Sequence, residues 1–474
     1  VGSEMCIRDR NIPGTEPDSV TSIPAADSTE VANVEEPQID TDQLTDIIDT
    51  DDYVFDKEVT KKAEETESFL STYRRVAKEE KPRGPFPYQT RFSANSMVTS
   101  WVIDPFRGFG ILLETEMNDM LENHKFNGGV MTTLDLKSGD VYAEYKYLKY
   151  LVDYNLRYER NVWYVNETEE LRQRYSKNKF EVGASLPFTA RSRLSFKHFY
   201  MFTRYQDHNI LTLLPNSAKA EANNTNYVGV STEFVFDNSI VKSQNVIVGT
   251  RFKFNFTHNE SLNDKSRSFD KVTLDLRHYQ KIYKNFVLAG RLYYGKFFGK
   301  FENNFMLGGM DNWLFQSDPE NASPWRPLVS QENNNIYFME YVTSLRGYNF
   351  IALNGTDVLL VNLELRVPVV SLLYNGPVRS SFAKNLQFVG FFDIGSSWTG
   401  PSPFSDENSI STVTTGDRIF EAEIQTFKNP WLSGYGVGMR SVILGYFMKF
   451  DLAWPLEDFQ VGDAKFYFTL GHDF

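Results

Sequence analysis

The chain has 474 residues, with one cysteine, six histidines and an aromatic content of 15%. A single cysteine excludes a disulfide framework and any cysteine-based zinc module. A mean hydropathy of −0.40, with no apolar run near eighteen residues, excludes a helical membrane protein. A transmembrane β-barrel is not excluded, because lumen-facing residues alternate with lipid-facing ones along its strands.

The first ten residues look foreign to any fold. Residues 5–9 read Met-Cys-Ile-Arg-Asp, which resembles the translation of a transposon end used in sequencing-library preparation. We interpret residues 1–10 as a non-native sequencing or cloning scar and leave them out of the fold prediction. Cys6 is then not native, and we expect the natural chain to begin further upstream.

The negative charge of the chain is concentrated in one segment. The formal net charge is −13, and residues 11–60 alone contain fourteen acidic residues against one lysine. This segment cannot bury enough apolar surface to offset its chain entropy, so we predict that residues 11–60 are disordered. Residues 61–85 have mixed charge and end in Pro-Arg-Gly-Pro, which predicts a linker with at most a short helix over 64–78.

From Phe86 onward the hydrophobic pattern has the two-residue period of β-strands. In residues 359–367, every odd position is leucine or valine and most even positions are polar or charged. A soluble sandwich and a membrane barrel both produce this alternation. Tyr446 and Trp454 stand at the two ends of the apolar set of another run, which favours the barrel because such rings belong at the level of the lipid headgroups.

The alternating runs predict sixteen strands, an even number as expected of a single-chain outer-membrane barrel. They cover residues 88–103, 109–118, 126–136, 140–149, 154–165, 178–189, 192–205, 225–237, 245–257, 269–282, 285–298, 357–370, 386–398, 432–443, 446–455 and 465–474. Long connections follow only odd-numbered strands, at 206–224, 299–356 and 399–431, with one medium exception at 371–385. Very short turns follow strands 6, 10 and 14. We therefore predict an all-β fold in which residues 86–474 form a 16-stranded antiparallel transmembrane β-barrel, with both termini on the turn side.

The predicted last strand has an aromatic pattern at the end of the chain. Phe466, Phe468 and Leu470 alternate along it, and Phe474 is the final residue. This resembles the C-terminal signal by which outer-membrane barrels are recognised for insertion. The alternative is a terminal strand that ends in phenylalanine by coincidence. If the signal is real, the barrel-assembly machinery is a partner for the chain's own insertion.

The last third of the chain contains short motifs in a characteristic order. They are Phe305–Gly309, Ser344–Tyr348, Asn362–Pro368, Phe391–Gly395, Gly434–Arg440 and Asp451–Pro455. In this order they resemble the bacterial surface antigen superfamily of BamA/TamA-like outer-membrane proteins. The resemblance is specific over residues 300–474, whereas over 86–299 only the strand count and the turn pattern support it. Residues 86–127 are also similar to barrels that follow a TolB-like propeller in Bacteroidetes proteins.

The resemblance implies a specific contact inside the barrel. In this family the connector after strand 11 folds back into the lumen, and the arginine of its Arg-Gly-aromatic tip meets acidic residues on the inner wall. The matching residues here are Leu345, Arg346, Gly347 and Tyr348 for the tip, with Glu364 and Asp393 for the acids. The strand alternation also points both acids inward, because their sequence neighbours are apolar. The alternative is an exposed Arg346, with Asp393 in a general lumenal charge ladder.

The sequence contains no recognisable catalytic or metal-binding motif. It has no His-Glu-x-x-His pair, no Gly-x-Ser-x-Gly elbow and no phosphate-binding loop. Ser195 and His198 are close in sequence but on opposite faces of one predicted strand. We therefore predict a protein that is not an enzyme and binds no metal or cofactor. A basic footprint for nucleic acid is absent as well.

The resemblance implies a barrel of the bacterial outer membrane that assists the insertion or translocation of polypeptides, with the lipid bilayer and client polypeptides as partners. A weakly paired seam between strand 88–103 and the last strand, with Gly471 near its end, would offer backbone groups as a template for an incoming strand. Family members usually carry periplasmic POTRA modules before the barrel, and this sequence has none. Two alternatives therefore stay open: a membrane anchor or surface barrel for a missing periplasmic module, and a plugged passive pore.

Overall fold

The computed structural model describes residues 69–79, 88 and 90–471, with gaps at 105–106, 169–170, 208–222, 244–245, 284, 302, 315–335, 375, 377, 418–419 and 428. The predicted scar at 1–10, the predicted disordered segment at 11–60 and most of the predicted linker at 61–85 lie outside the described residues, so these boundaries stay predictions. Within the linker, α1 (Phe69–Glu79) is an amphipathic helix that covers most of the short helix considered for 64–78. It belongs to a unit separate from the barrel.

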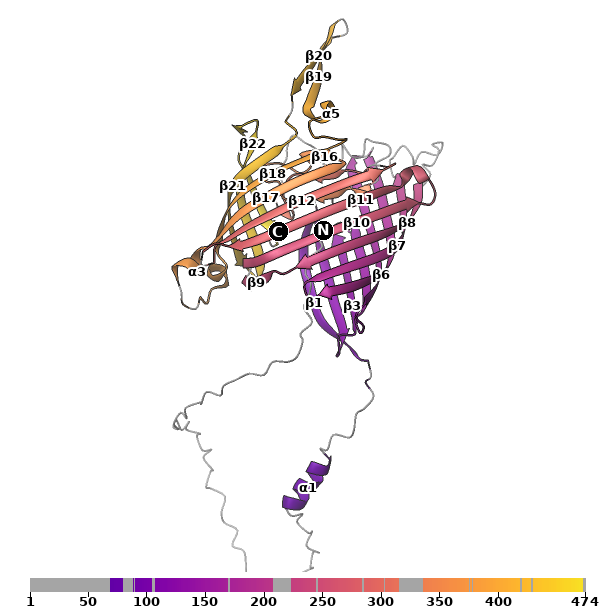
Figure 1. Cartoon of the computed structure of the whole chain (residues 1–474), viewed down its shortest axis with the longest axis vertical. Coiled ribbons are helices and arrows are strands. Elements are labelled where there is room, and N and C mark those ends of the chain that lie inside the picture. Colours follow the sequence, from indigo (N-terminus) through magenta and orange to yellow (C-terminus); the bar gives the residue numbers. More distant parts are fainter. Residues whose placement is uncertain are drawn as a thin grey trace, which may run out of the picture. The chain divides into compact units, whose positions relative to one another are not determined.

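Sixteen long strands form the wall of a barrel (Figure 1). They are β1 (Phe92–Asp104), β2 (Gly108–Asp119), β3 (His124–Thr133), β4 (Gly139–Tyr147), β5 (Asp153–Thr168), β6 (Leu171–Thr189), β7 (Ser192–Asp207), β8 (Asn223–Asp237), β10 (Val246–Ser261), β11 (Phe269–Lys281), β12 (Val287–Gly299), β17 (Asp357–Pro368), β18 (Gln387–Trp398), β21 (Leu432–Ile443), β22 (Tyr446–Glu457) and β24 (Lys465–Leu470). Each pairs antiparallel with the next in this series. The prediction of an all-β antiparallel barrel is confirmed, and every predicted strand is present.

Three short strands extend this wall. β9 (Ile240–Ser243) and β23 (Gln460–Val461) pair with β10 and β22. β14 (Trp313–Leu314) comes from the connector after β12 and pairs antiparallel with the last strand, β24. Counted with β14 but without the short β9 and β23, the nearly closed barrel has 17 strands, one more than the sixteen predicted. Two residues are too few to show an alternation, which is why β14 was missed.

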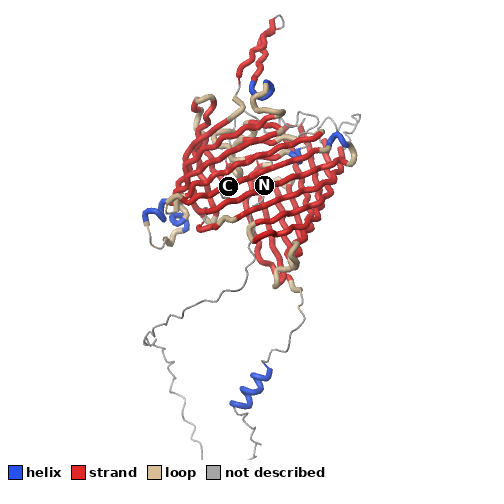
Figure 2. Tube along the Cα trace, in the orientation of Figure 1, coloured by secondary structure: helices blue, strands red, loops and turns tan. Residues whose placement is uncertain are grey.

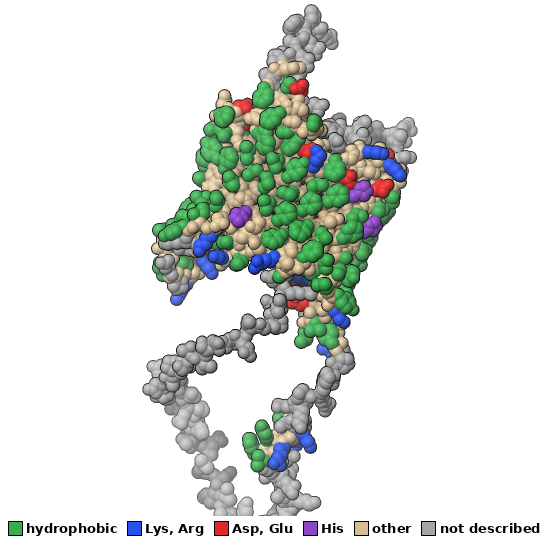
Figure 3. All heavy atoms as spheres, viewed as in Figure 1, with side chains coloured by type: hydrophobic (Ala, Val, Ile, Leu, Met, Phe, Trp, Pro, Cys, Tyr) green, Lys and Arg blue, Asp and Glu red, His purple; other side chains and the backbone are tan. Residues whose placement is uncertain are grey.

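The strand alternation separates an apolar outer face from a polar inner face. On β17, Leu363 and Leu365 keep 46% and 41% of their surface exposed, whereas Glu364 between them keeps 2%. Phe392 and Asp393 on β18 show the same contrast, at 38% and 0%. On the face in view, Figure 3 shows hydrophobic side chains over most of the outer wall, with few charged side chains among them. An exposed apolar band of this extent is the surface that a bilayer covers.

Several short elements lie in the connections between the wall strands. The short elements within them are η2 (Lys265–Arg267), α3 (Val369–Leu373), α4 (Ser381–Lys384), α5 (Asp406–Ser409) and the hairpin β19 (Ile410–Asp417) and β20 (Phe420–Phe427). The hairpin and α3 lie at opposite ends of the barrel (Figure 2). Among the described residues, no helix is both long and apolar enough to cross a membrane.

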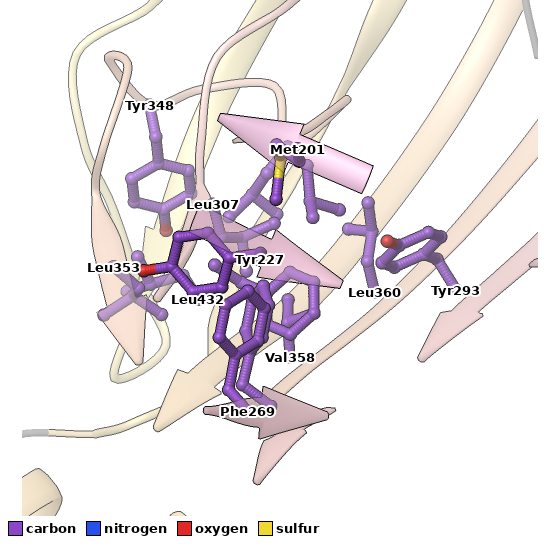
Figure 4. Close-up of a cluster of buried hydrophobic side chains, with 14 of the residues drawn as sticks. Met201, Tyr227, Phe269, Tyr293, Leu307, Tyr348, Leu353, Val358, Leu360 and Leu432 are labelled. Atoms are coloured by element: carbon purple, nitrogen blue, oxygen red, sulfur yellow. The ribbon is translucent and has the colours of Figure 1, made fainter. Parts of the chain in front are cut away.

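The described part of the connector between β12 and β17 folds inside the barrel around a small sheet of its own. Its elements are β13 (Phe305–Leu307), η3 (Ile336–Phe338), β15 (Glu340–Val342) and β16 (Leu353–Gly355), with β13 between the other two strands. Leu307 and Leu353 of the connector pack with Tyr227 and Phe269 of the wall in one buried cluster (Figure 4). The connector therefore fills this side of the lumen, as the resemblance implied.

Replacing Leu363 by arginine tests the assignment of the outer face. Leu363 lies at the middle of β17 and its side chain points outward. If that face contacts lipid, Leu363→Arg lowers the free energy of unfolding by about 2–4 kcal/mol, because a basic side chain is costly at the bilayer midplane. The measurement is chemical unfolding of the protein in phospholipid vesicles, with Leu363→Met as the control. Equal stabilities of the two variants would contradict a lipid-facing wall.

Candidate functional site

The connector presents its tip to the inner wall through a sharp backbone turn. Leu345 forms a bridge to Gly309 at the far side of the connector, which fixes the start of the turn. Gly347 has φ +99°, a left-handed conformation that glycine adopts without strain. A β carbon at this position would lie 2.9 Å from the backbone nitrogen of Pro455 on β22. Only glycine therefore combines this turn with this close approach to the wall.

Arg346 at the tip binds two carboxylates of the wall at once. Its Nε and Nη2 atoms donate to the two oxygens of Asp393 at 2.6 and 2.8 Å. Its Nη1 atom donates to Glu364 Oε1 at 2.8 Å, and its backbone N–H donates to Asp393 Oδ2 at 3.2 Å. The planar guanidinium group suits this double contact, which a lysine ammonium group does not reproduce.

The surroundings of Arg346 exclude water. The side chain of Arg346 is 1% exposed, and its guanidinium carbon lies 3.6 Å from the ring centre of Phe391, in cation–π geometry. Burial alone would lower the pKa of Arg346, but the charges of Asp393 and Glu364 outweigh it and raise this pKa well above its ordinary value. The tip therefore carries a permanent charge whose stability depends on its partners.

The ion pairs of Arg346 belong to a larger buried network. Arg366 on β17 binds Glu364 at 2.8 Å, and Arg440 on β21 binds both oxygens of Asp451 on β22 at 2.5 and 3.0 Å. Asp451 also lies 3.8 Å from Arg346. The three arginines and three acids carry matched formal charges, which is the condition under which such a buried set is tolerated.

Glycines on the inner face of β21 make room for the tip and for the side chains of the ion network. Gly434, Gly436 and Gly438 occupy successive inward positions of the sequence Gly-Tyr-Gly-Val-Gly. A β carbon on Gly434 would lie 1.9 Å from the carbonyl oxygen of Arg346, and one on Gly438 would lie 1.8 Å from Asp451 Oδ1. Glycine is thus required at Gly434 by the inserted connector and at Gly438 by Asp451 of the neighbouring strand β22.

Two tyrosines attach the tip to the last strands of the barrel wall. Tyr467 on β24 accepts a hydrogen bond from the Gly347 N–H at 2.9 Å and donates one to the Tyr348 carbonyl oxygen at 2.7 Å. The Tyr348 hydroxyl donates to the Ser433 carbonyl oxygen of β21 at 2.9 Å. The tip consequently contacts β17, β18, β21, β22 and β24 together.

The structure brings together the tip and the two acids that the sequence singled out. Sequence reasoning missed the roles of Arg366, Arg440, Asp451 and Tyr467. Each stands at an inward position of an alternating run, but the alternation does not reveal its partner. Phe466, Phe468 and Leu470 lie on β24, with at least part of each side chain exposed, while Phe474 lies outside the described residues. Their role as an insertion signal stays a prediction.

Nothing in the described part of the chain suggests a metal site, since no three His, Cys, Asp or Glu side chains come together suitably there.

The geometry defines a class of protein: a large antiparallel membrane barrel whose lumen holds a folded connector through an arginine. The sequence over residues 130–474 matches the Omp85 superfamily domain, and the chain belongs to that superfamily. This confirms the resemblance to BamA/TamA-like barrels, while the relation to propeller-linked barrels stays a prediction.

A comparison with solved structures finds similar barrels at low sequence identity, and the first of them has the same fold. BamA from Haemophilus ducreyi lacking POTRA domains 1–3 has a TM-score of 0.50 and 11% identity, over 85% of this chain and 79% of that one. CdiB from Acinetobacter baumannii has a TM-score of 0.44 and 12% identity, over 81% of this chain and 60% of that one. CdiB from Escherichia coli has a TM-score of 0.45 and 11% identity, over 81% and 63%. No curated protein matches the sequence significantly.

Membership of the superfamily indicates where the protein is located and to which broad functional class it belongs. Omp85 barrels are non-enzymatic insertion or transport proteins, so the chain is a bacterial outer-membrane protein of that class and not an enzyme. The membership therefore agrees with the expectation, drawn from the missing catalytic motifs, that the protein performs no chemistry.

Substituting Arg346 by methionine tests the buried network. The change leaves Asp393 and Glu364 buried without their cation, and we expect a loss of about 3–5 kcal/mol in the free energy of unfolding. Arg157→Met is the matched control, because this lumenal arginine is 34% exposed where it pairs with Glu159 and should contribute at most about 1 kcal/mol. Guanidinium titration in detergent micelles measures both. Losses of equal size would mean that Arg346 is solvated.

Substituting Gly434 by alanine tests the fit of the tip against β21. The added methyl group collides with the backbone of Arg346, so we expect the connector to leave the wall. Limited proteolysis of the connector and planar-bilayer conductance should then both increase. Gly390→Ala is the control, because a β carbon there meets no atom within 4 Å. If Gly434→Ala behaves like this control, the tip does not pack as described.

Proposed function

We propose that this chain assists the insertion or translocation of polypeptides at the outer membrane by offering strand edges at its seam. The observation that carries this proposal is the way in which the barrel closes. Among the described residues, no ladder joins β1 to β24, although every other neighbouring pair in the series of sixteen is joined. An edge with unpaired backbone N–H and C=O groups is a template for another strand.

The lengths of the two seam strands support this proposal. β1 has 13 residues, whereas β24 has 6, so β24 is too short to cover the whole edge of β1. The first eight residues of β1 are exposed, in contrast to the inward residues of β17 and β18. A long, accessible edge beside lipid is the place where an incoming strand would gain hydrogen bonds without crossing an intact wall.

The filled lumen argues against a wide passive pore. Connector residues such as Phe305, Leu307 and Leu345 are completely buried against the wall, and the ion network binds the tip beside them. On the side of the lumen that the connector fills, a solute would have to displace this packed body, whereas a strand that enters through the seam would not. The same filling is compatible with an anchor for a periplasmic module, which the experiment must therefore distinguish.

The test measures client folding by vesicles that contain the chain. A small outer-membrane barrel is added in urea, and its folding is followed by the heat-dependent shift of its electrophoretic mobility. We expect faster folding with the chain than with empty vesicles. A thiol cross-linker between cysteines at Ile103 on β1 and Leu470 on β24 should abolish this acceleration, because the backbones of both residues contact Asn312 and the linker clamps the seam there. The background carries Cys6→Ser.

The matched control clamps a closed part of the wall. Val130 on β3 and Val141 on β4 are direct cross-strand partners with exposed side chains, and cysteines at these positions should leave the acceleration intact. Absence of any acceleration, with conductance across a planar bilayer, would favour the pore. Absence of both activities would favour the anchor.

A further inference from the structure

The seam of the barrel is bridged by a residue of the lumenal connector. Asn312 accepts a hydrogen bond on Oδ1 from the backbone N–H of Ile103 on β1, at 3.1 Å. Its Nδ2 atom donates to the carbonyl oxygen of Leu470 on β24, at 3.2 Å. A single side chain thus contacts both seam strands, at the place where a β1–β24 ladder would stand. Asparagine also suits the backbone there, which has φ +53°.

The residues after Asn312 occupy the seam-side edge of β24. Trp313 pairs with Thr469 and Leu314 pairs with Phe468, in antiparallel register. The edge of β24 is therefore already used as a template, by an extended segment of the same chain. β22 takes the other edge of β24, so the positions held by β14 are those that a further strand would need.

The side chain of Trp313 adds aromatic contacts to this backbone pairing. It is 7% exposed, and its ring lies 4.5 Å from the ring of Tyr467 and 5.5 Å from that of Phe350, measured between ring centres. Beside it, the hydroxyl of Thr469 is buried and has no hydrogen-bond partner within the described residues. The site therefore accepts an aromatic side chain and leaves one polar group of β24 unsatisfied.

The same tyrosine connects this segment to the connector tip. Tyr467 packs on Trp313 through its ring, and its hydroxyl group contacts Gly347 and Tyr348. Met310, two residues before Asn312, is buried in the same cluster as Trp313 and Tyr467. The position of the tip and the occupancy of the β24 edge are therefore physically coupled through one side chain.

The attachment is much smaller than the ladders of the wall. It consists of a two-residue strand and the two hydrogen bonds of Asn312, whereas β1 pairs with β2 over its whole length. A contact of this size can be exchanged for another strand without breaking the wall. Its aromatic anchor nevertheless gives it a defined position.

We infer that Asn312, Trp313 and Leu314 form a latch, which closes the seam by binding the edge of β24 and tethering it to β1. The partner that replaces the latch is an extended polypeptide strand that runs antiparallel to β24 and places an aromatic residue opposite Thr469. Displacement of the latch opens the seam and releases the contact of Trp313 with Tyr467. The tethering follows from the contacts alone, whereas the exchange for a client strand rests on the proposed function.

The first experiment measures the seam directly. Spin labels at Thr99 on β1 and Val437 on β21 report the distance across the seam, and labels at Val130 on β3 and Val182 on β6 report an intact wall. Asn312→Ala should lengthen and broaden the first distance distribution in lipid nanodiscs and leave the second unchanged. Asn354→Ala, an exposed asparagine of the same connector, is the control variant. An unchanged seam distribution in Asn312→Ala overturns the latch.

The second experiment locks the latch in place and does not depend on the folding of a weakened variant. Cysteines at Leu314 and Phe468 are direct partners in the ladder, and their disulfide holds β14 on β24. In the client-folding assay this disulfide should remove the acceleration, and a reductant should restore it, while the Val130–Val141 cysteine pair has no effect. Full acceleration with the latch locked overturns its displacement. If Asn312→Ala opens the seam but the unmodified chain accelerates no client, the tethering stands and the proposed function fails.

Discussion

The burial of one positive charge is the constraint on which the inner structure of this barrel depends. A guanidinium group without water is tolerated only where carboxylates replace the solvent. Arg346 belongs to the connector, whereas Asp393 and Glu364 belong to β18 and β17, so neither the wall nor the connector satisfies its charges alone. Insertion of the connector and completion of the ion network are therefore one event. Gly434 of β21 leaves the space that the backbone of Arg346 needs.

The bilayer imposes the second constraint, which acts on the outer faces of the same strands, β17 and β18. Because successive side chains of a strand point to opposite faces, lipid contact at Leu363 and Phe392 forces Glu364 and Asp393 into the lumen. The apolar outer wall and the buried ion network are two consequences of a single alternation. A register slip of one residue would place carboxylates in lipid and leucines against the tip.

The strong contacts of the ion network lie close to the weakest contact of the wall, which is the attachment of β14 and Asn312 at the seam. The ion network ties the connector to β17, β18 and β22, and Tyr467 continues these contacts to β24. In the described part of the chain, the wall beyond β24 has only the short β14 and the side chain of Asn312. A rigid support behind a weakly attached edge suits the proposed function, in which the barrel admits another chain without losing its own structure.

The sequence by itself determined the fold class, the sixteen long strands and the side on which each residue lies, because the strand period acts over a few residues and lipid selects the apolar face. The family resemblance further indicated that Arg346 meets Glu364 and Asp393. Only the tertiary structure decided that Arg440 binds Asp451, that Tyr467 holds the tip, and that Asn312 joins β1 to β24. These contacts arise where segments far apart in the chain meet after barrel closure, and a local pattern carries no information about such meetings.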